Sequence, residues 1–306
     1  MDKAELIEKG YIPFDKSWHI RMGVMDLLGG RDDTLHFLKP LLTNGKLSDD
    51  LKALYAASYA WKQGWERVYV GESATLYRFL KFASWNLNAK KEFMIEKTLK
   101  EREICDDPGI ANLPLEGLLK LDHKTSQWAS AAVVYDAVFG EGIERIQTDK
   151  PKLLLTYEAV DHWKEKRERG ERWDIKYDDT LATQAEAYLG LLKTGKMEFE
   201  PKQPEDYCFA RAFGIIKPEE VEHYRQKWES LEGHESKRVD EMEAALWDYA
   251  QKGMVYSRDH RVVQAIAMLA EYEGKDTKKM FRHMDAVKKS WPEFWRFLED
   301  SGKLAA

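Results

Sequence analysis

The chain is poor in several features that define common classes of protein. Among its 306 residues are only two cysteines, Cys105 and Cys208, which lie far apart. Two distant thiols make neither a disulfide framework nor a zinc site, so a reducing compartment is expected. No apolar run reaches the roughly eighteen residues of a membrane span, and the first twenty residues hold no signal-peptide stretch. The sequence therefore predicts a cytoplasmic protein without a membrane segment.

An excess of positive charge is also absent. Lys and Arg together number 48 against 54 acidic residues, so the net charge is −6. No general basic surface for nucleic acid follows from this balance. The 9 prolines and 19 glycines are too few for a collagen-like or low-complexity chain. With 43% hydrophobic residues, the chain can bury the core of one large domain or of two ordinary ones.

Helical periodicity dominates what is present. Residues 49–63 place Leu51, Leu54 and Tyr55 near one face, directly after a serine that is typical of an N-cap. Further amphipathic helices are expected at 17–28, 74–86, 126–138, 153–166, 179–193, 205–215, 218–231, 236–251, 260–273 and 291–300. Short strand signals occur at 68–70, 93–95, 173–177 and 254–256. Short strands between helices predict a layered α/β or α+β fold.

Several short segments concentrate anion-binding groups at expected loop-to-helix junctions. Unpaired backbone N–H groups and the helix dipole favour phosphate or carboxylate at such places. Ser17 and Arg21 share one side of the first such helix, and residues 125–127 put two hydroxyls and an amide at another helix start. Each segment also has an ordinary structural interpretation, because Ser and Thr are common N-caps. His260 follows an acid, but no second His or Cys spacing supports a metal site.

Taken in order, these segments resemble the motifs of the enolpyruvyl transferase family, on the branch that acts on shikimate 3-phosphate. The similar stretches are DKSWHIR (15–21), GESATLYR (71–78), KERE (100–103), TSQWASA (125–131), HESKR (234–238), DHR (259–261) and KSWPEF (289–294). The resemblance covers most of the chain.

The resemblance implies an α/β (α+β) fold of two domains built from βαβαββ-type units, with the second domain truncated. The first domain is expected at 14–203, and the second at 1–13 together with 204–306. Residues 201–206 hold two prolines in a polar setting and are the expected hinge. The family's active site lies in the cleft between its two domains.

The implied activity is transfer of an enolpyruvyl group from phosphoenolpyruvate to a hydroxyl of shikimate 3-phosphate or a related phosphorylated acceptor, with release of phosphate. This chemistry belongs to the shikimate pathway and needs an acid, a base and several cations, but no metal and no cofactor. The resemblance implies catalysis by Lys16 and Glu235, phosphoenolpyruvate binding by Lys16, Arg102, Gln127, Arg238, Arg261 and Lys289, and acceptor binding by Ser17, Arg21, Thr125, Ser126 and Gln127. The planar fork of arginine suits phosphate and carboxylate independently of the resemblance.

The chain also departs from the family. Residues 217–233 predict one amphipathic helix where the family carries a further folding unit and the aspartate that takes the acceptor proton. Asp149 stands where the family has a serine, and its charge would repel an acceptor phosphate. Two alternatives therefore stay open. One is a non-catalytic descendant that binds an anionic metabolite or a protein partner, and the other is an α-rich scaffold with surface charge. The sequence does not predict an oligomeric state.

Overall fold

The protein is mainly helical. Its computed structural model describes residues 1–140, 142–233 and 236–305. Helices hold 64% of the residues and strands 4%. Among the described residues the sheet has two strands, β1 (Arg67–Gly71) and β2 (Glu92–Ile95), which pair in parallel. The predicted α/β fold of βαβαββ-type units is therefore wrong.

The physical reason is that few of the short strand signals form a β ladder. The apolar signal at 68–70 finds a partner in 93–95, whereas residues 254–256 reach only one isolated bridge, between Val255 and Phe281. In the signal at 173–177, Trp173 is buried against helices and donates its indole N–H to Asp26 (2.7 Å). A β ladder needs a second segment at the right distance, which a short apolar run does not supply by itself.

The chain divides into two compact units, each with its own hydrophobic core. Unit 1 comprises Met1–Pro13 and Tyr177–Ala306, and unit 2 comprises Phe14–Lys176. Residues 201–206, where a hinge is expected, lie inside unit 1. No helix in the described part of the chain is long and apolar enough to cross a membrane.

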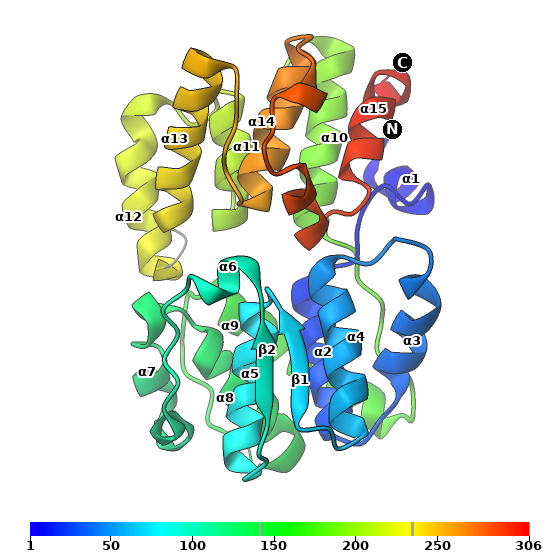
Figure 1. The fold of residues 1–306 in the computed structure, drawn as a ribbon, viewed down its shortest axis with the longest axis vertical. Helices are drawn as coiled ribbons and strands as arrows, with labels where there is room; N and C mark the ends of the chain where they lie inside the picture. The colour runs from blue at the N-terminus through cyan, green and yellow to red at the C-terminus, as the bar shows by residue number, and fades with distance from the viewer. Residues whose placement is uncertain (141, 234–235, 306) are drawn as a thin grey trace. The chain divides into compact units, whose positions relative to one another are not determined.

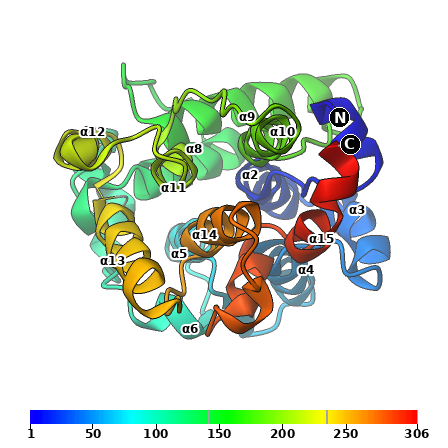
Figure 2. The same ribbon diagram turned by 90° about the horizontal axis from the view of Figure 1, so that it is seen from above.

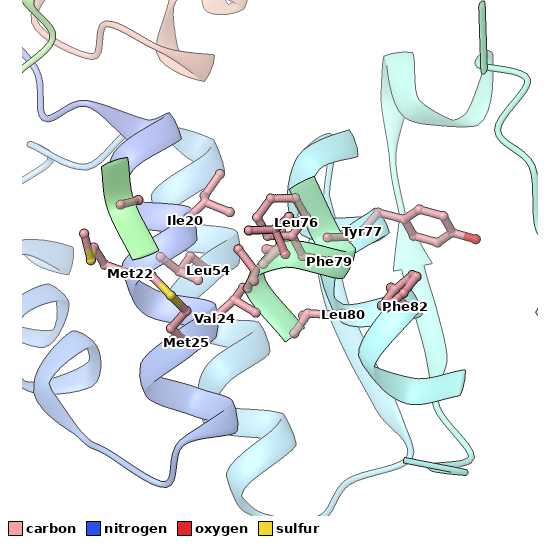
Figure 3. Close-up of a cluster of buried hydrophobic side chains, with 14 of the residues drawn as sticks. Ile20, Met22, Val24, Met25, Leu54, Leu76, Tyr77, Phe79, Leu80 and Phe82 are labelled. Atoms are coloured by element: carbon pink, nitrogen blue, oxygen red, sulfur yellow. The ribbon is translucent and has the colours of Figure 1, made fainter. Parts of the chain in front are cut away.

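In unit 2 the helices lie behind and beside the small sheet (Figure 1). Besides β1 and β2, its elements are α2 (Lys16–Leu28), α3 (Asp33–Leu42), α4 (Asp49–Lys62), α5 (Ala74–Asn86), α6 (Lys97–Lys100), η1 (Pro108–Asn112), α7 (Leu115–Leu118), η2 (Asp122–Lys124), α8 (Gln127–Phe139) and α9 (Pro151–Glu168). The helices predicted at 17–28, 49–63 and 74–86 are confirmed within two residues at each end. Figure 3 shows apolar side chains of α2, α4 and α5 meeting in one cluster.

Unit 1 is a helical assembly in which α14 lies among α11, α13 and α15 (Figure 2). Its elements are α1 (Lys3–Glu8), α10 (Asp179–Thr194), η3 (Pro204–Asp206), α11 (Tyr207–Ala212), η4 (Pro218–Glu220), α12 (Val221–Leu231), α13 (Ser236–Lys252), α14 (His260–Tyr272), η6 (Thr277–Lys279), η7 (Met284–Lys289) and α15 (Phe294–Ala305). Residues 217–233 contain η4 and α12, and this helical prediction is confirmed.

Candidate functional site

The residues predicted to bind the acceptor on α2 are tied to the protein itself. Arg21 is fully buried and donates from Nε to Thr156 Oγ1 (2.7 Å), from Nη1 to the Ser17 carbonyl (2.8 Å) and from Nη2 to the Lys152 carbonyl (2.9 Å). Lys16, the predicted catalytic lysine, forms an ion pair with Asp50 (Nζ to Oδ2, 2.7 Å). These cations therefore hold helices together.

The predicted hydroxyl and amide ligands lie at the start of α8. Thr125, Ser126 and Gln127 are all buried there, and Ser126 is the N-cap residue of the helix. Oε1 of Gln127 has no hydrogen-bond partner among the described residues. Arg102 lies in the same unit but is exposed, just after the end of α6.

The remaining predicted phosphoenolpyruvate ligands lie in unit 1. Arg238 donates from Nε to Asp259 Oδ2 (3.1 Å), and Asp259 also caps α14 by accepting from the Arg261 backbone amide (2.8 Å). Burial acts to raise the pKa of the Asp259 carboxyl, but the charges of Arg238 and His260 outweigh it and hold that pKa well below its usual range. Arg261 is buried, and Lys289 is half-buried at the end of η7. The predicted catalytic residue Glu235 lies outside the described residues.

Cys105 and His19 are two further side chains that could carry chemistry. Burial, followed by the nearby Asp122, raises the pKa of the exposed Cys105 thiol, so it does not favour a thiolate. Burial lowers the pKa of His19 to about 4, and its ring packs against Phe37 and Trp173. Among the residues described here, no group of three or more His, Cys, Asp or Glu side chains is placed to hold a metal ion.

A different feature of unit 1 has the geometry of a binding site. It is a surface groove with a volume of about 840 Å³. This volume falls within the range of roughly 300–1,000 Å³ that is usual for ligand sites. The groove is lined by Lys3, Asp179, Thr180, Thr183, Glu186, Ala187, Gly190, Thr194, Lys196, Glu198, Phe199, Glu200, Lys202, Gln203 and Asp206. One wall is therefore α10, and the other is the segment that follows it.

The α10 wall presents small side chains. Thr183, Ala187, Gly190 and Thr194 recur at spacings of three and four residues, which places them on one helix face. A Cβ atom added to Gly190 would meet nothing within 4 Å. A glycine inside a helix lowers the stability of the helix by about 1 kcal/mol relative to alanine. At position 190 no neighbouring atom would clash with the Cβ of a larger residue. The helix surface is therefore open to close approach from outside.

The opposite wall has the pattern of an extended strand without a partner. From Lys196 to Gln203 the residues alternate strictly between exposed and half-buried, which is the two-residue period of extended chain. Phe199 belongs to the half-buried set and packs against Phe209, with ring centroids 4.8 Å apart. In the part of the chain that the structure describes, the backbone N–H groups of residues 197–200 have no hydrogen-bond partner. No β ladder of the described residues includes this segment; because of its alternating pattern and unpaired N–H groups, we call residues 196–203 the strand edge.

Both ends of this strand edge are fixed in place. At the first end, Gly195 adopts the left-handed conformation (φ 71°), and Thr194 Oγ1 accepts from the Lys196 amide (3.2 Å). At the second end, the Asp206 carboxylate accepts from the amides of Lys202 (3.0 Å) and Gln203 (3.3 Å). Gln184 of α10 donates to the same carboxylate (3.1 Å). Burial raises the pKa of Asp206 despite these donors. The edge is thus preorganised, which lowers the entropic cost of binding.

The charges along the edge form a symmetric series. Glu198 and Glu200 lie in the middle, and Lys196 and Lys202 lie outside them. Within the described ranges, Glu186, Glu198 and Glu200 form no ion pair. The groove is therefore lined by carboxylates that have no ion-pair partner among the described residues. Sequence reasoning missed this groove, although its signals are readable as the alternating run KMEFEPK (196–202) and a glycine inside a predicted helix.

Comparison with known proteins identifies no relative. No protein family matches this chain, and neither does any curated protein or solved structure.

Proposed function

We propose that the protein is a protein-binding scaffold whose groove in unit 1 holds an extended segment of a partner protein. The observation that carries this proposal is the open strand edge at residues 197–200, facing the small-residue wall of α10 across the groove. An extended peptide that adds to such an edge gains main-chain hydrogen bonds, and the pockets beside it select its side chains.

The dimensions of the two walls agree with such a guest. Residues 196–203 span about 26 Å at roughly 3.3 Å per residue of extended chain. The 16 residues of α10 span about 24 Å at roughly 1.5 Å per residue. A guest segment of about seven or eight residues would therefore run the length of the groove. At Gly190 the α10 wall leaves open space for a side chain of that guest.

Binding is favoured over catalysis by the way the polar residues are used. Arg21, Lys16 and Arg238 are engaged by groups of the protein itself. The groove requires no acid, base or metal for its proposed role. The enolpyruvyl transfer that the resemblance implies stays a prediction, to be checked by phosphate release from phosphoenolpyruvate and shikimate 3-phosphate. A cytoplasmic location likewise stays a proposal, based on the scarcity of cysteine.

The test is selection from a display library of random twelve-residue peptides, followed by affinity measurement on the enriched peptides. We expect the wild-type chain to enrich a set of peptides. Gly190→Leu should bind these peptides at least tenfold more weakly, because the new side chain would occupy the groove at the α10 wall. Gly302→Leu is the matched control, since Gly302 also lies in a helix and has nothing within 4 Å of an added Cβ.

Thermal unfolding of both variants checks that they are folded, and neither substitution should lower stability, because leucine is a better helix former than glycine. The proposal fails if the library yields no binders, or if Gly190→Leu binds the enriched peptides as tightly as Gly302→Leu does.

A further inference from the structure

The charge series on the strand edge carries information about the partner. Lys196, Glu198, Glu200 and Lys202 all belong to the exposed set of the alternating segment, and all four line the groove. They are arranged symmetrically about Phe199, with the acids one residue away and the lysines three residues away. Alternate residues of an extended chain share one face, so the four charges lie in one row.

A second copy of this chain is a poor occupant for that row. Pairing of two identical edges about a two-fold axis is antiparallel, and the register with the longest overlap is centred on Phe199. In that register Glu198 would lie opposite Glu200 of the second copy, and Lys196 opposite Lys202 of the second copy. Like charges directly opposite each other destabilise a strand pair. The charges therefore disfavour pairing between the strand edges of two copies, as charged residues on edge strands generally do.

We propose that the partner segment carries two basic residues separated by one apolar residue, with acidic residues two positions outside them. This inference rests on the proposed function of the groove. The two basic side chains would face Glu198 and Glu200, and Glu186 of α10 adds a further carboxylate to the same groove. The outer acidic residues would face Lys196 and Lys202.

The apolar residue at the centre of the guest follows from its neighbours. A residue directly opposite Phe199 in a strand pair shares the face of Phe199. Phe199, Ala187 and Gly190 all line the groove, and the two small residues leave space for an apolar side chain there. Because the charge series is symmetric, the guest meets the same charges whether it runs parallel or antiparallel to the edge.

Two synthetic peptides test this specificity. The first has the sequence Asp-Ala-Lys-Leu-Lys-Ala-Asp. The second, Lys-Ala-Glu-Leu-Glu-Ala-Lys, has charges of the opposite sign at the same positions. Both are capped at both ends and labelled for fluorescence anisotropy. The wild-type chain should bind the first peptide about tenfold more tightly than the second. The preference should weaken in high salt, because the pairs are partly exposed.

Reversal of the central charges should reverse the preference. The double variant Glu198→Lys/Glu200→Lys is expected to bind the second peptide more tightly than the first. The matched control is Glu219→Lys/Glu229→Lys, which changes the net charge of unit 1 equally at exposed residues that do not line the groove. The control should keep the wild-type preference.

The outcomes separate this inference from the proposal on which it rests. Equal affinity for the two peptides, or a preference that the double variant leaves unchanged, overturns the charge rule while the groove remains a peptide site. Binding of neither peptide also overturns it, and enrichment from the random library then decides whether the groove binds peptides at all. A wild-type dimer in sedimentation that dissociates in the double variant would overturn it too, because a second copy would then be the occupant.

Discussion

Helices α2 and α10 have similar N-caps, but α2 is buried and α10 keeps one face open. The Asp15 carboxylate accepts from the amides of Ser17 (2.9 Å) and Trp18 (3.0 Å) at the start of α2, and Asp178 accepts from Leu181 (2.9 Å) at the start of α10. Residues 18–26 of α2 are nevertheless all buried, whereas α10 leaves its face at residues 183–194 to the groove. Local capping therefore starts both helices, and tertiary packing alone decides which helix keeps an open face.

The comparison also separates two uses of charge. Arg21 on the covered helix donates hydrogen bonds to the Thr156 hydroxyl and to two backbone carbonyls and has no solvent exposure. Glu186 on the open helix has no ion-pair partner among the described residues and lines the groove. A charged side chain on a covered helix stabilises the fold, and one on an open face is available to a ligand.

The largest expected effect comes from removing the covered charge. Arg21→Ala should lower the free energy of unfolding by about 3–5 kcal/mol, because it leaves a cavity and removes one hydrogen-bond donor each from the Thr156 hydroxyl and two carbonyls. Glu186→Ala on the open helix should change it by less than about 0.5 kcal/mol. Urea unfolding measures both variants. Equal losses of stability in the two variants would contradict the claim that a charge on the covered helix stabilises the fold and a charge on the open face does not.

The pH dependence of stability tests a second buried group of the covered helix, His19. Its pKa is lowered by burial to about 4 from an ordinary value of 6.5, so folding favours the neutral ring. The stabilisation is fully present above pH 6.5 and is lost as the pH falls toward 4, by up to about 3 kcal/mol. The carbonyl of Asp15 lies 2.6 Å from Nδ1, and its carboxylate opposes the shift.

The control for that series is His19→Phe, which keeps a ring beside Phe37 and Trp173 but removes the titrating group. Urea unfolding between pH 7 and 4 should show a shallower loss of stability in the variant than in the wild type. Parallel curves for the two proteins would mean that His19 does not titrate as described.

The smallest expected effect compares two glycines inside helices. Gly190→Ala on the open face should raise the free energy of unfolding by about 0.5–1 kcal/mol, since the new methyl meets nothing. Gly23→Ala in α2 should instead lower it by about 1 kcal/mol, because a Cβ there would lie 2.8 Å from Leu54 Cδ2 and 3.0 Å from Thr34 Cγ2. Thermal unfolding measures both, and stabilisation of similar size in both would show that the packing around Gly23 yields without cost.

Much of the helical structure was predictable because its signals are local. The helix expected at 74–86 begins and ends where α5 does, and the one expected at 179–193 differs from α10 by one residue. The fold class was predicted wrongly because several segments that resemble enolpyruvyl transferase motifs are helix starts. Asp15 caps α2, Asp259 caps α14 and Ser126 is the N-cap residue of α8. Asp and Ser are favoured at helix starts in any protein, so these matches carry little information about topology.

The candidate site was less predictable than the helices. The resemblance to the enolpyruvyl transferase family implied that Arg21 and Arg238 bind ligands, and the planar fork of arginine suits anions. Whether such a group faces a ligand or a neighbouring helix depends on residues far away in the sequence, such as Thr156 for Arg21. The groove has the opposite character, since residues 179–206 supply nearly all of it and its alternating pattern can be read directly from the sequence.

The sequence by itself determined where helices such as α5 and α10 start and stop, which residues alternate along the 196–203 edge, and the symmetric order of its charges. These properties follow from backbone capping, side-chain periodicity and residue identity, which act within a few positions of one another. Only the tertiary structure decided that the short strand signals would yield one two-stranded sheet, that α2 would be covered and that one face of α10 would stay open. Those outcomes depend on which distant segments bury apolar surface together, and no local pattern specifies that choice.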